Sequence, residues 1–235
     1  MIKEVIILAG GLGTRLRSAL PDIPKCMAPV NGKPFLQYVM DYLEIYGVKK
    51  IILATGYLHE KIEEYFHNKY KYMNIEYSRE DEPLGTGGAV KKAMEKAEGK
   101  QVVVMNGDTM FRVNLGKLYD FTLIKKSDLT MVVRQINDVS RYGAVEFDET
   151  GRITTFREKG SLEGPGWING GTYVIRKDFF LNESLPEKFS LEKDYFEKIY
   201  LQHPIYANKC YQYFIDIGIP EDYERAQEEF RAFEF

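Results

Sequence analysis

The glycine-rich segment near the N-terminus carries residue types that bind phosphate. Gly10-Gly11-Leu12-Gly13 follows an apolar run, and Thr14 and Arg15 come directly after it. Glycines let backbone amides approach phosphate oxygens closely, and an arginine donates two parallel hydrogen bonds to them. Lys25 stands shortly after this segment and would bring a second cation to the same anion. These residues indicate a site for a phosphate-bearing small molecule; a charged surface turn and a solvated lysine are the alternatives.

Two well-known phosphate-binding motifs do not fit this turn. A Walker loop requires Gly-Lys-Ser/Thr, but Gly32-Lys33 leads into Pro34. The dinucleotide fingerprint requires a third glycine at the position where this chain has Leu16. The assignment of a nucleotide site therefore depends on further segments.

Two aspartates follow apolar runs at positions suited to a metal ion. Asp108 ends the segment Met105-Asn106-Gly107-Asp108, and Asp216 follows Tyr213-Phe214-Ile215. Carboxylate oxygens are hard ligands for Mg²⁺ and would bridge the ion to phosphate oxygens. A plain turn at Asp108 and a helix cap at Asp216 are the alternatives. Two acids and two cations together favour a site for phosphate and magnesium.

The elements that must place these side chains alternate along the first half of the chain. Continuous apolar, β-branched runs are typical of strands covered on both faces of a parallel sheet. The alternation with amphipathic stretches predicts an α/β fold, a doubly wound, mostly parallel, Rossmann-like sheet with ligands beyond the carboxyl ends of its strands. The predicted strands are 5–9, 51–54 and 102–105, and the predicted helices contain residues 35–43, 62–66 and 89–97, with Thr86 as a candidate cap.

After about residue 110 the sequence changes to shorter apolar runs separated by turns. The predicted strands are 129–133, 144–147, 153–156 and 172–175, and the predicted helices are 191–201 and 221–233. We expect this extra β structure to extend the sheet and close over the pocket. No Pro/Ser-rich linker or internal repeat divides the sequence, so residues 1–235 are expected to form a single domain.

Composition narrows the class of protein. The 235 residues are 44% hydrophobic and 14% aromatic, which argues against disorder. A formal charge of −3 predicts no nucleic-acid surface, and two cysteines with three scattered histidines predict neither a zinc cluster nor a disulfide framework. The apolar runs are far shorter than the roughly 18 residues of a membrane span, so we expect a cytoplasmic protein with no membrane contact. Seventeen tyrosines and fourteen phenylalanines would permit a homo-oligomer, although core burial accounts for many of them.

Segments from both halves of the chain combine the features above with further motifs. They are residues 8–16, Pro24-Lys25, 82–89, 106–108, 142–145, 156–159, 168–171 and 216–218. Together they resemble the sugar-1-phosphate nucleotidyltransferase family, in family order and over nearly the whole chain. The resemblance implies a nucleotidyltransferase domain in which residues 1–110 form the nucleotide-binding half and residues 111–235 the sugar-phosphate-binding half.

The resemblance also implies a role for each matching residue. Arg15 would contact the β- and γ-phosphates of a nucleoside triphosphate, and Lys25 would contact the α-phosphate. Asp108 and Asp216 would hold Mg²⁺, the expected cofactor, and Lys159 would bind the phosphate of the sugar 1-phosphate. The implied catalytic residues are Arg15, Lys25, Asp108 and Lys159. The implied nucleotide-binding residues are Leu8, Gly10, Gly11, Gly13, Thr14, Arg15, Lys25, Glu80, Gly85 and Thr86, and the implied sugar-phosphate-binding residues are Gly143, Glu158, Lys159 and Asn169.

Glu80 bears on the identity of the base, because it aligns with the base-reading position of this family, five residues before Gly85. A carboxylate only accepts hydrogen bonds, and guanine presents two adjacent donors, N1–H and its exocyclic amine. Uracil and thymine present one donor between two carbonyls, which an amide suits better. We therefore predict GTP as the donor; a solvated glutamate in the acidic run Glu80-Asp81-Glu82 is the alternative.

The sugar is predicted from resemblance alone, since hydroxyl selectivity depends on pocket shape. Among guanylyltransferases, this short chain is most similar to those acting on D-glycero-α-D-manno-heptose 1-phosphate, with mannose 1-phosphate as the alternative. Uridylyl, thymidylyl or cytidylyl transfer by the same fold also stays open, as does a regulatory subunit that only binds nucleotide. Transfer to phosphocholine would require an aromatic cage, for which Tyr142, Trp167 and Tyr173 are candidates.

Overall fold

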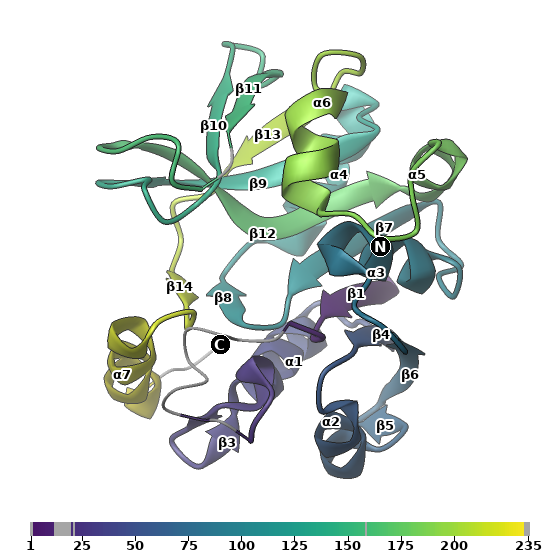
Figure 1. The fold of residues 1–235 in the computed structure, drawn as a ribbon, viewed down its shortest axis with the longest axis vertical. Helices are drawn as coiled ribbons and strands as arrows, with labels where there is room; N and C mark the ends of the chain where they lie inside the picture. Colours follow the sequence, from purple (N-terminus) through teal and green to yellow (C-terminus); the bar gives the residue numbers. More distant parts are fainter. Residues whose placement is uncertain (1, 12–19, 21, 158, 233–235) are drawn as a thin grey trace.

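A computed structural model of the chain describes residues 2–11, 20, 22–157 and 159–232. Gly13, Thr14, Arg15 and Glu158, which the sequence analysis gave roles, lie outside these residues. In Figure 1 the first half of the chain fills the lower part of the view and the β-rich second half the upper part. The C-terminal helix α7 (Pro220–Glu229) returns to the lower part beside the first half.

The predicted parallel sheet is present, and its four parallel strands lie in the order β7-β1-β4-β6. Side chains of β1 alternate between two cores: Val5 and Ile7 pack on the side of α1, whereas Ile6 packs on the side of α3. Helices therefore cover both faces of the sheet, as expected for a doubly wound fold. The bounds in this half are β1 (Glu4–Leu8), α1 (Phe35–Ile45), β4 (Lys50–Thr55), α2 (His59–Phe66), β5 (Lys69–Tyr70), β6 (Met73–Arg79), α3 (Gly85–Met94) and β7 (Gln101–Asn106).

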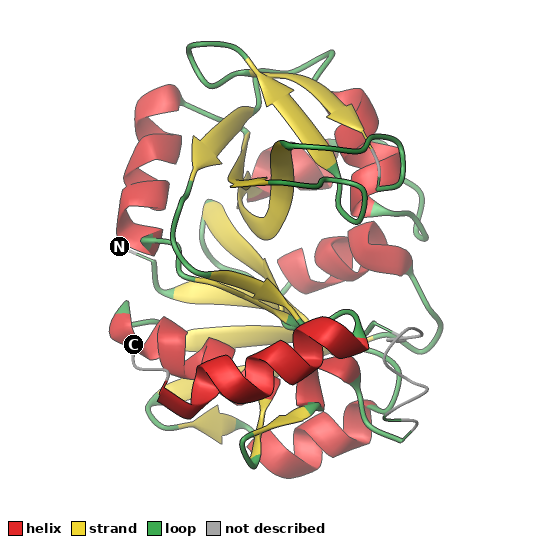
Figure 2. Cartoon of the chain, turned by 90° about the vertical axis from the view of Figure 1, so that its left-hand side faces the viewer, coloured by secondary structure: helices red, strands yellow, loops and turns green. Residues whose placement is uncertain are grey.

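The second half joins the same sheet through an antiparallel pair. Strand β12 (Gly166–Arg176) pairs with β7, and Thr172 lies opposite Met105. Among the described residues ten strands form this sheet, so the extra β structure extends it as expected (Figure 2). The remaining bounds are α4 (Leu115–Lys125), β9 (Leu129–Ile136), β10 (Ala144–Phe147), β11 (Ile153–Arg157), α5 (Lys177–Asn182), α6 (Glu197–Ile199) and β13 (Tyr206–Lys209).

Two small sheets and three short helical turns complete the described structure. Strand β8 (Thr109–Phe111) pairs antiparallel with β14 (Phe214–Asp216), and β2 (Pro29–Val30) pairs with β3 (Lys33–Pro34). The turns are the 3₁₀ helices η1 (Lys25–Met27) and η3 (Phe230–Ala232) and the π-helix η2 (Leu191–Phe196). No helix in the described part of the chain has the length and apolar character needed to cross a bilayer.

Two local predictions were inexact, and strand β6 was not predicted. Thr86 is not a helix cap, because α3 begins at Gly85 and the Thr86 hydroxyl instead donates to Glu192. The helix predicted over 191–201 divides into η2 and the short α6. Strand β6 had no continuous apolar run to reveal it, because its residues alternate between buried and exposed.

Candidate active site

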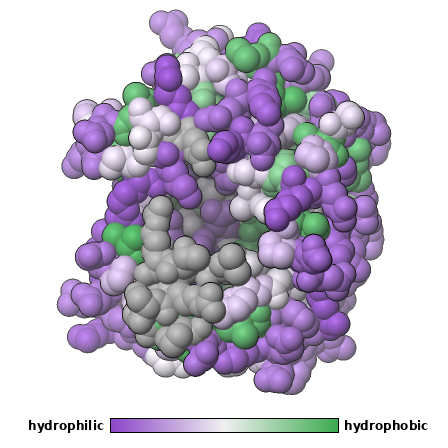
Figure 3. All heavy atoms as spheres, in the orientation of Figure 1, coloured by the Kyte–Doolittle hydropathy of each residue, from purple (hydrophilic) through white to green (hydrophobic). Residues whose placement is uncertain are grey.

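A cavity of about 520 Å³ lies beyond the carboxyl ends of β1 and β7. In the space-filling view this face of the molecule has a central hollow with hydrophilic residues around it (Figure 3). The described residues that line the cavity are Gly11, Lys25, Thr86, Asn106, Asp108, Arg141, Tyr142, Gly143, Lys159, Asn169, Ser190, Glu192, Asp216 and Gly218. Both halves of the chain therefore contribute to one cavity.

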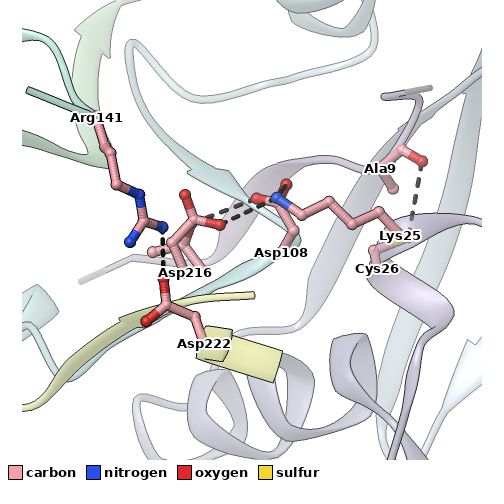
Figure 4. Close-up of polar contacts among 8 residues, drawn as sticks. Ala9, Lys25, Cys26, Asp108, Arg141, Asp216 and Asp222 are labelled. Atoms are coloured by element: carbon pink, nitrogen blue, oxygen red, sulfur yellow. Dashed lines mark hydrogen bonds and ion pairs between the residues drawn. The ribbon is translucent and has the colours of Figure 1, made fainter. Parts of the chain in front are cut away.

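Lys25, Asp108 and Asp216 meet in this cavity although they come from three separate segments (Figure 4). The Lys25 ammonium donates to Asp108 Oδ2 at 2.5 Å and to Asp216 Oδ1 at 3.0 Å. Asp108 follows β7, and the β8–β14 pair places Asp216 opposite Thr109. The Ile217 amide also donates to the Asp108 carbonyl at 3.1 Å. The small antiparallel sheet thus brings the second predicted acid to the first.

Burial and the neighbouring charges both shift the pKa values of Lys25 and Asp216. Burial by itself lowers the pKa of Lys25, but the charges and hydrogen bonds of Asp108 and Asp216 outweigh it and raise that pKa above its ordinary value. Burial also raises the pKa of Asp216, with the nearby Lys25 charge opposing the rise and Asp108 adding to it. Lys25 is therefore a firmly charged ammonium, and Asp216 is an acid that gains from further positive charge.

The two carboxylates fit Mg²⁺ in one specific way. In nucleotide sites this ion is bound by one or two carboxylates, and its octahedral shell is completed by waters and substrate phosphates. Within the residues that the structure describes, no group of three or more His, Cys, Asp or Glu is placed to hold a metal. The donor set of Asp108 and Asp216 therefore suits an ion that arrives with a phosphate.

Residues of the predicted sugar-phosphate set lie at the other side of the same cavity. Gly143, Lys159 and Asn169 all line it. The Asn169 side chain is fixed at both ends, since its amide nitrogen donates to the Tyr173 hydroxyl at 2.7 Å and its oxygen accepts from the Gly171 amide at 3.0 Å. The Asn169 backbone amide also donates to the Gly143 carbonyl at 2.8 Å. These bonds hold the β12 strand against the loop that carries Gly143.

Sequence reasoning missed three polar residues of this cavity. Arg141 lines it and donates to Asp222 of α7 at 2.5 Å. Glu192 lies in η2 and accepts from the Thr86 hydroxyl at 2.8 Å, and Ser190 donates to the same Glu192 oxygen at 3.2 Å. The position of Arg141 beside the Tyr142-Gly143 motif was the one available signal. In the structure, the Ser190 side chain also caps η2 by accepting from the Lys193 amide.

Glu80 and Gly10 line a second cavity, of about 510 Å³. One Glu80 oxygen, Oε2, accepts from the Leu84 amide at 2.8 Å, and burial raises the pKa of this carboxyl above its ordinary value. A Cβ on Gly10 would come within 3.2 Å of the other oxygen, Oε1, and within 3.0 Å of the Gly56 nitrogen. A side chain at this position would therefore crowd the Gly56 backbone and the Glu80 carboxylate. Since Gly10 lines one cavity and its neighbour Gly11 the other, the two cavities adjoin at this turn.

The remaining predicted site residues lie elsewhere. Leu8 ends β1 and lines neither cavity. Gly85 begins α3, and a Cβ on it would lie 2.5 Å from the Phe189 carbonyl oxygen. The roles predicted for Gly13, Thr14, Arg15 and Glu158 fall outside the described residues.

The three aromatic residues considered for a quaternary-ammonium cage are not brought together. Tyr142 lines the first cavity, whereas Trp167 packs edge-on against Phe147 and Tyr211. Tyr173 is fully buried, with its ring against Phe196. This arrangement disfavours phosphocholine as the acceptor.

Comparison with known proteins agrees with this geometry. D-glycero-α-D-manno-heptose 1-phosphate guanylyltransferase of Aneurinibacillus thermoaerophilus is 49% identical over 98% of this chain and 99% of its own length. The Campylobacter jejuni protein of the same name is 44% identical over 94% and 96%. The crystal structure of HddC from Yersinia pseudotuberculosis complexed with GMP-PN superposes with a TM-score of 0.87 at 40% identity, covering 97% of this chain and 100% of that one. Residues 4–232 match the nucleotidyl transferase family model, so this chain belongs to the nucleotidyl transferase family and is a nucleotidyltransferase.

Proposed function

We propose that this enzyme transfers a guanylyl group from GTP to D-glycero-α-D-manno-heptose 1-phosphate, giving the GDP-sugar and pyrophosphate. The heptose assignment is supported by the names of the two relatives at 49% and 44% identity. The guanine assignment is supported by a structure of a protein at 40% identity, which is complexed with GMP-PN.

The observation that carries the base assignment is the fixed Glu80 carboxylate. The Leu84 amide donates to its Oε2. Glu80 lines the second cavity, and this cavity adjoins the first one, which contains Lys25, at Gly10-Gly11. A carboxylate held in this way accepts from adjacent donors, as guanine N1–H and the exocyclic amine present them. Glu80 would therefore read the guanine edge while the phosphates reach toward Lys25.

The residues of the first cavity fit an in-line displacement. A phosphate oxygen of the sugar phosphate attacks the α-phosphorus of GTP, and the bond to the β-phosphate oxygen breaks with its electrons leaving on pyrophosphate. Lys25 would stabilise the charge on the α-phosphate, and Lys159 would hold the incoming phosphate. Magnesium, when held by Asp108 and Asp216, supplies charge neutralisation to the triphosphate. The attacking phosphate is already ionised, so no protein base is needed.

We further propose a division of labour along the chain. Residues 1–110 supply the nucleotide side, including Glu80, Lys25 and Asp108, and residues 111–235 supply the sugar-phosphate side. The Arg15 and Glu158 roles, on the β/γ-phosphates and the sugar, remain part of this proposal. Use of cellular GTP, together with two free, buried cysteines, Cys26 and Cys210, favours the cytoplasm as the proposed compartment.

The test is a matrix of four nucleoside triphosphates against heptose 1-phosphate and mannose 1-phosphate, with pyrophosphate release measured with and without Mg²⁺. We expect the largest kcat/KM for GTP with the heptose phosphate, and dependence on Mg²⁺. A preference for UTP or dTTP would refute the base assignment. A preference for mannose 1-phosphate would refute the heptose assignment and identify mannose 1-phosphate as the acceptor. Absence of pyrophosphate from every pair would refute the proposed function.

A further inference from the structure

The Lys25 ammonium lies between the two carboxylates that the proposed function assigns to the metal. It contacts Asp108 at 2.5 Å and Asp216 at 3.0 Å, and Figure 4 shows its side chain reaching to both. The Lys25 side chain is 15% exposed, compared with 28% for Asp108 and 26% for Asp216. This is a largely desolvated ion cluster, in which each carboxylate uses an oxygen on the same cation.

In the protein without substrate, the ammonium of this cluster offsets the repulsion between the two carboxylates. Two carboxylates that lie close together and are partly buried repel each other unless a positive charge lies between them. The ammonium, with three donors, supplies that charge and fixes the orientation of both acids. Lys25 therefore offsets the repulsion between the two aspartates and holds one oxygen of each toward the same point.

The same position is needed by a divalent cation. Mg²⁺ binds carboxylate oxygens at about 2.0–2.1 Å, and a second positive charge in contact with those oxygens repels it. The Lys25 nitrogen already contacts Asp108 Oδ2 and Asp216 Oδ1, so a metal ion that binds these two oxygens competes with it. Lys25 must leave these two oxygens for the metal ion to take them.

We propose that Lys25 is a built-in substitute for the metal, which holds the Asp108–Asp216 pair in the free enzyme and gives it up when metal and nucleotide arrive together. The triphosphate offers the displaced ammonium a new anionic partner, whereas metal alone does not. Metal and nucleotide thus bind with positive coupling, and Lys25 is the residue that couples them. This inference rests on the metal site of the proposed function.

The flexible side chain of Lys25 makes the exchange feasible. Four methylene groups carry the ammonium, and the residue begins the short η1 turn at the wall of the cavity. Gly11, from the turn predicted to bind phosphate, lines the same cavity. A rotation of the side chain would therefore carry the charge from the aspartates toward the phosphates without a change of fold.

The primary test measures metal binding without turnover. Mn²⁺, as a spectroscopic substitute for Mg²⁺, is titrated into nucleotide-free protein and free Mn²⁺ is followed by electron paramagnetic resonance. We expect Lys25→Met to bind Mn²⁺ more tightly than wild type, on the order of tenfold. Lys69→Met, which removes an exposed lysine of β5, should match wild type. Lys25→Arg keeps the charge and should bind Mn²⁺ no more tightly than wild type.

Thermal unfolding supplies a second readout for variants that fold poorly. Lys25→Met leaves the two acids without a counter-ion, so its melting temperature should be low and should rise on addition of Mg²⁺ alone. Wild type should respond strongly to Mg²⁺ only when a non-hydrolysable GTP analogue is also present. Lys25→Gln provides a smaller neutral variant for the same comparison.

The outcomes are distinguishable from those of the activity assay. Equal Mn²⁺ affinity of wild type and both neutral variants, or tight binding by Lys25→Arg, would overturn the proposal while leaving guanylyl transfer intact. Failure to produce pyrophosphate would refute the proposed function but would not affect the Mn²⁺ comparison, since no sugar phosphate is present. If no variant binds Mn²⁺, with or without nucleotide, the proposed metal site at Asp108 and Asp216 is refuted.

Discussion

Single charges dominate the behaviour of the first cavity. One ammonium faces two carboxylates there, so the cluster retains net negative charge before any substrate binds. A cation that arrives with a triphosphate therefore reduces the repulsion between this cluster and the phosphates. The effects of changing one residue here should therefore appear in metal and substrate binding more than in the fold.

Asp108→Asn tests the predicted metal ligand. The change removes a negative charge with almost no change in volume, so the variant should fold normally by circular dichroism. Turnover at saturating Mg²⁺ should fall by about 100-fold or more, because loss of a direct ligand costs at least as much as loss of a residue that orients one. Full activity of the folded variant would show that Asp108 does not hold the metal.

Glu80→Gln tests the base assignment. An amide presents one acceptor and one donor, so it no longer matches the two donors of guanine. We expect kcat/KM for GTP to fall about 10–100-fold, as for loss of a charge-assisted hydrogen bond, and the ratio of UTP to GTP activity to rise. Glu64→Gln on the exposed side of α2 serves as the control. An unchanged ratio would place the base recognition elsewhere.

Glu80 should also affect stability as a function of pH. Burial raises its pKa in the folded chain above the ordinary value of 4.5, so the folded state keeps this proton to higher pH than the unfolded state. The contribution of Glu80 to stability therefore falls as the pH rises through the window above 4.5. Urea unfolding from about pH 4 to about pH 7 should show Glu80→Gln gaining stability relative to wild type. A relative loss over that range would contradict the assigned burial effect.

At the scale of elements, helix α3 and the segment that precedes η2 fit together with almost no space. The Gly87 and Gly88 amides both point to the Phe189 carbonyl, with nitrogen–oxygen distances of 3.0 and 3.4 Å. A Cβ on Gly88 would lie 2.3 Å from the Glu187 carbonyl oxygen, which is backbone and cannot turn aside. This contact sets where Ser190 and Glu192 enter the cavity.

Gly88→Ala is predicted to disturb this contact. Alanine gains about 1 kcal/mol of helix propensity, but overpacking against backbone costs about 1–3 kcal/mol and shifts the segment. We expect net destabilisation in urea and a higher KM for both substrates. The matched control is Gly116→Ala in α4, where a Cβ would meet the Asn114 side chain at 3.5 Å, so that change should be neutral or stabilising. Equal effects of the two substitutions would show that the α3 contact does not constrain the site.

At the scale of the whole molecule, the cavity exists because two halves of the chain share one sheet and are tied at a second place. The antiparallel β7–β12 pair is the first connection. The second is helix α7, whose Gln227 side chain donates to the Pro29 carbonyl of the first half at 2.7 Å and whose buried Asp222 pairs with Arg141 at the cavity wall; Figure 4 shows Asp222 beside Asp216. Asp222 also contacts Arg225 at 3.2 Å. The C-terminal helix therefore holds Arg141 in place at the cavity wall.

Asp222→Asn should weaken this second connection. Loss of a buried charge that accepts from Arg141 is expected to lower the free energy of unfolding by about 1–3 kcal/mol, nearer the lower figure because Arg141 is 39% exposed. The KM for the sugar phosphate should rise as Arg141 loses its fixed position. Asp178→Asn, which breaks an exposed pair with Arg176, should cost about 0–1 kcal/mol. Equal stabilities of the two variants would show that the link to α7 does not matter.

The sequence by itself determined the alternating strands and helices of the first half, the glycine turn at Gly10-Gly11 and the acids Asp108 and Asp216. These are local signals, since apolar runs, glycines and strand-end polar residues act over a few positions. The family motifs added Glu80, Lys159 and Asn169, and the structure places all three at cavities.

Only the tertiary structure decided which distant residues meet. Thr86 and Glu192 are 106 positions apart and Lys25 and Asp216 are 191 apart, yet each pair is hydrogen-bonded. No periodicity encodes such contacts, because they depend on which strands pair and how closely α3 packs against the segment before η2. Arg141, Ser190 and Glu192 became site residues, and Lys25 became a partner of both acids, because the packing of the whole sheet brought their segments to one cavity.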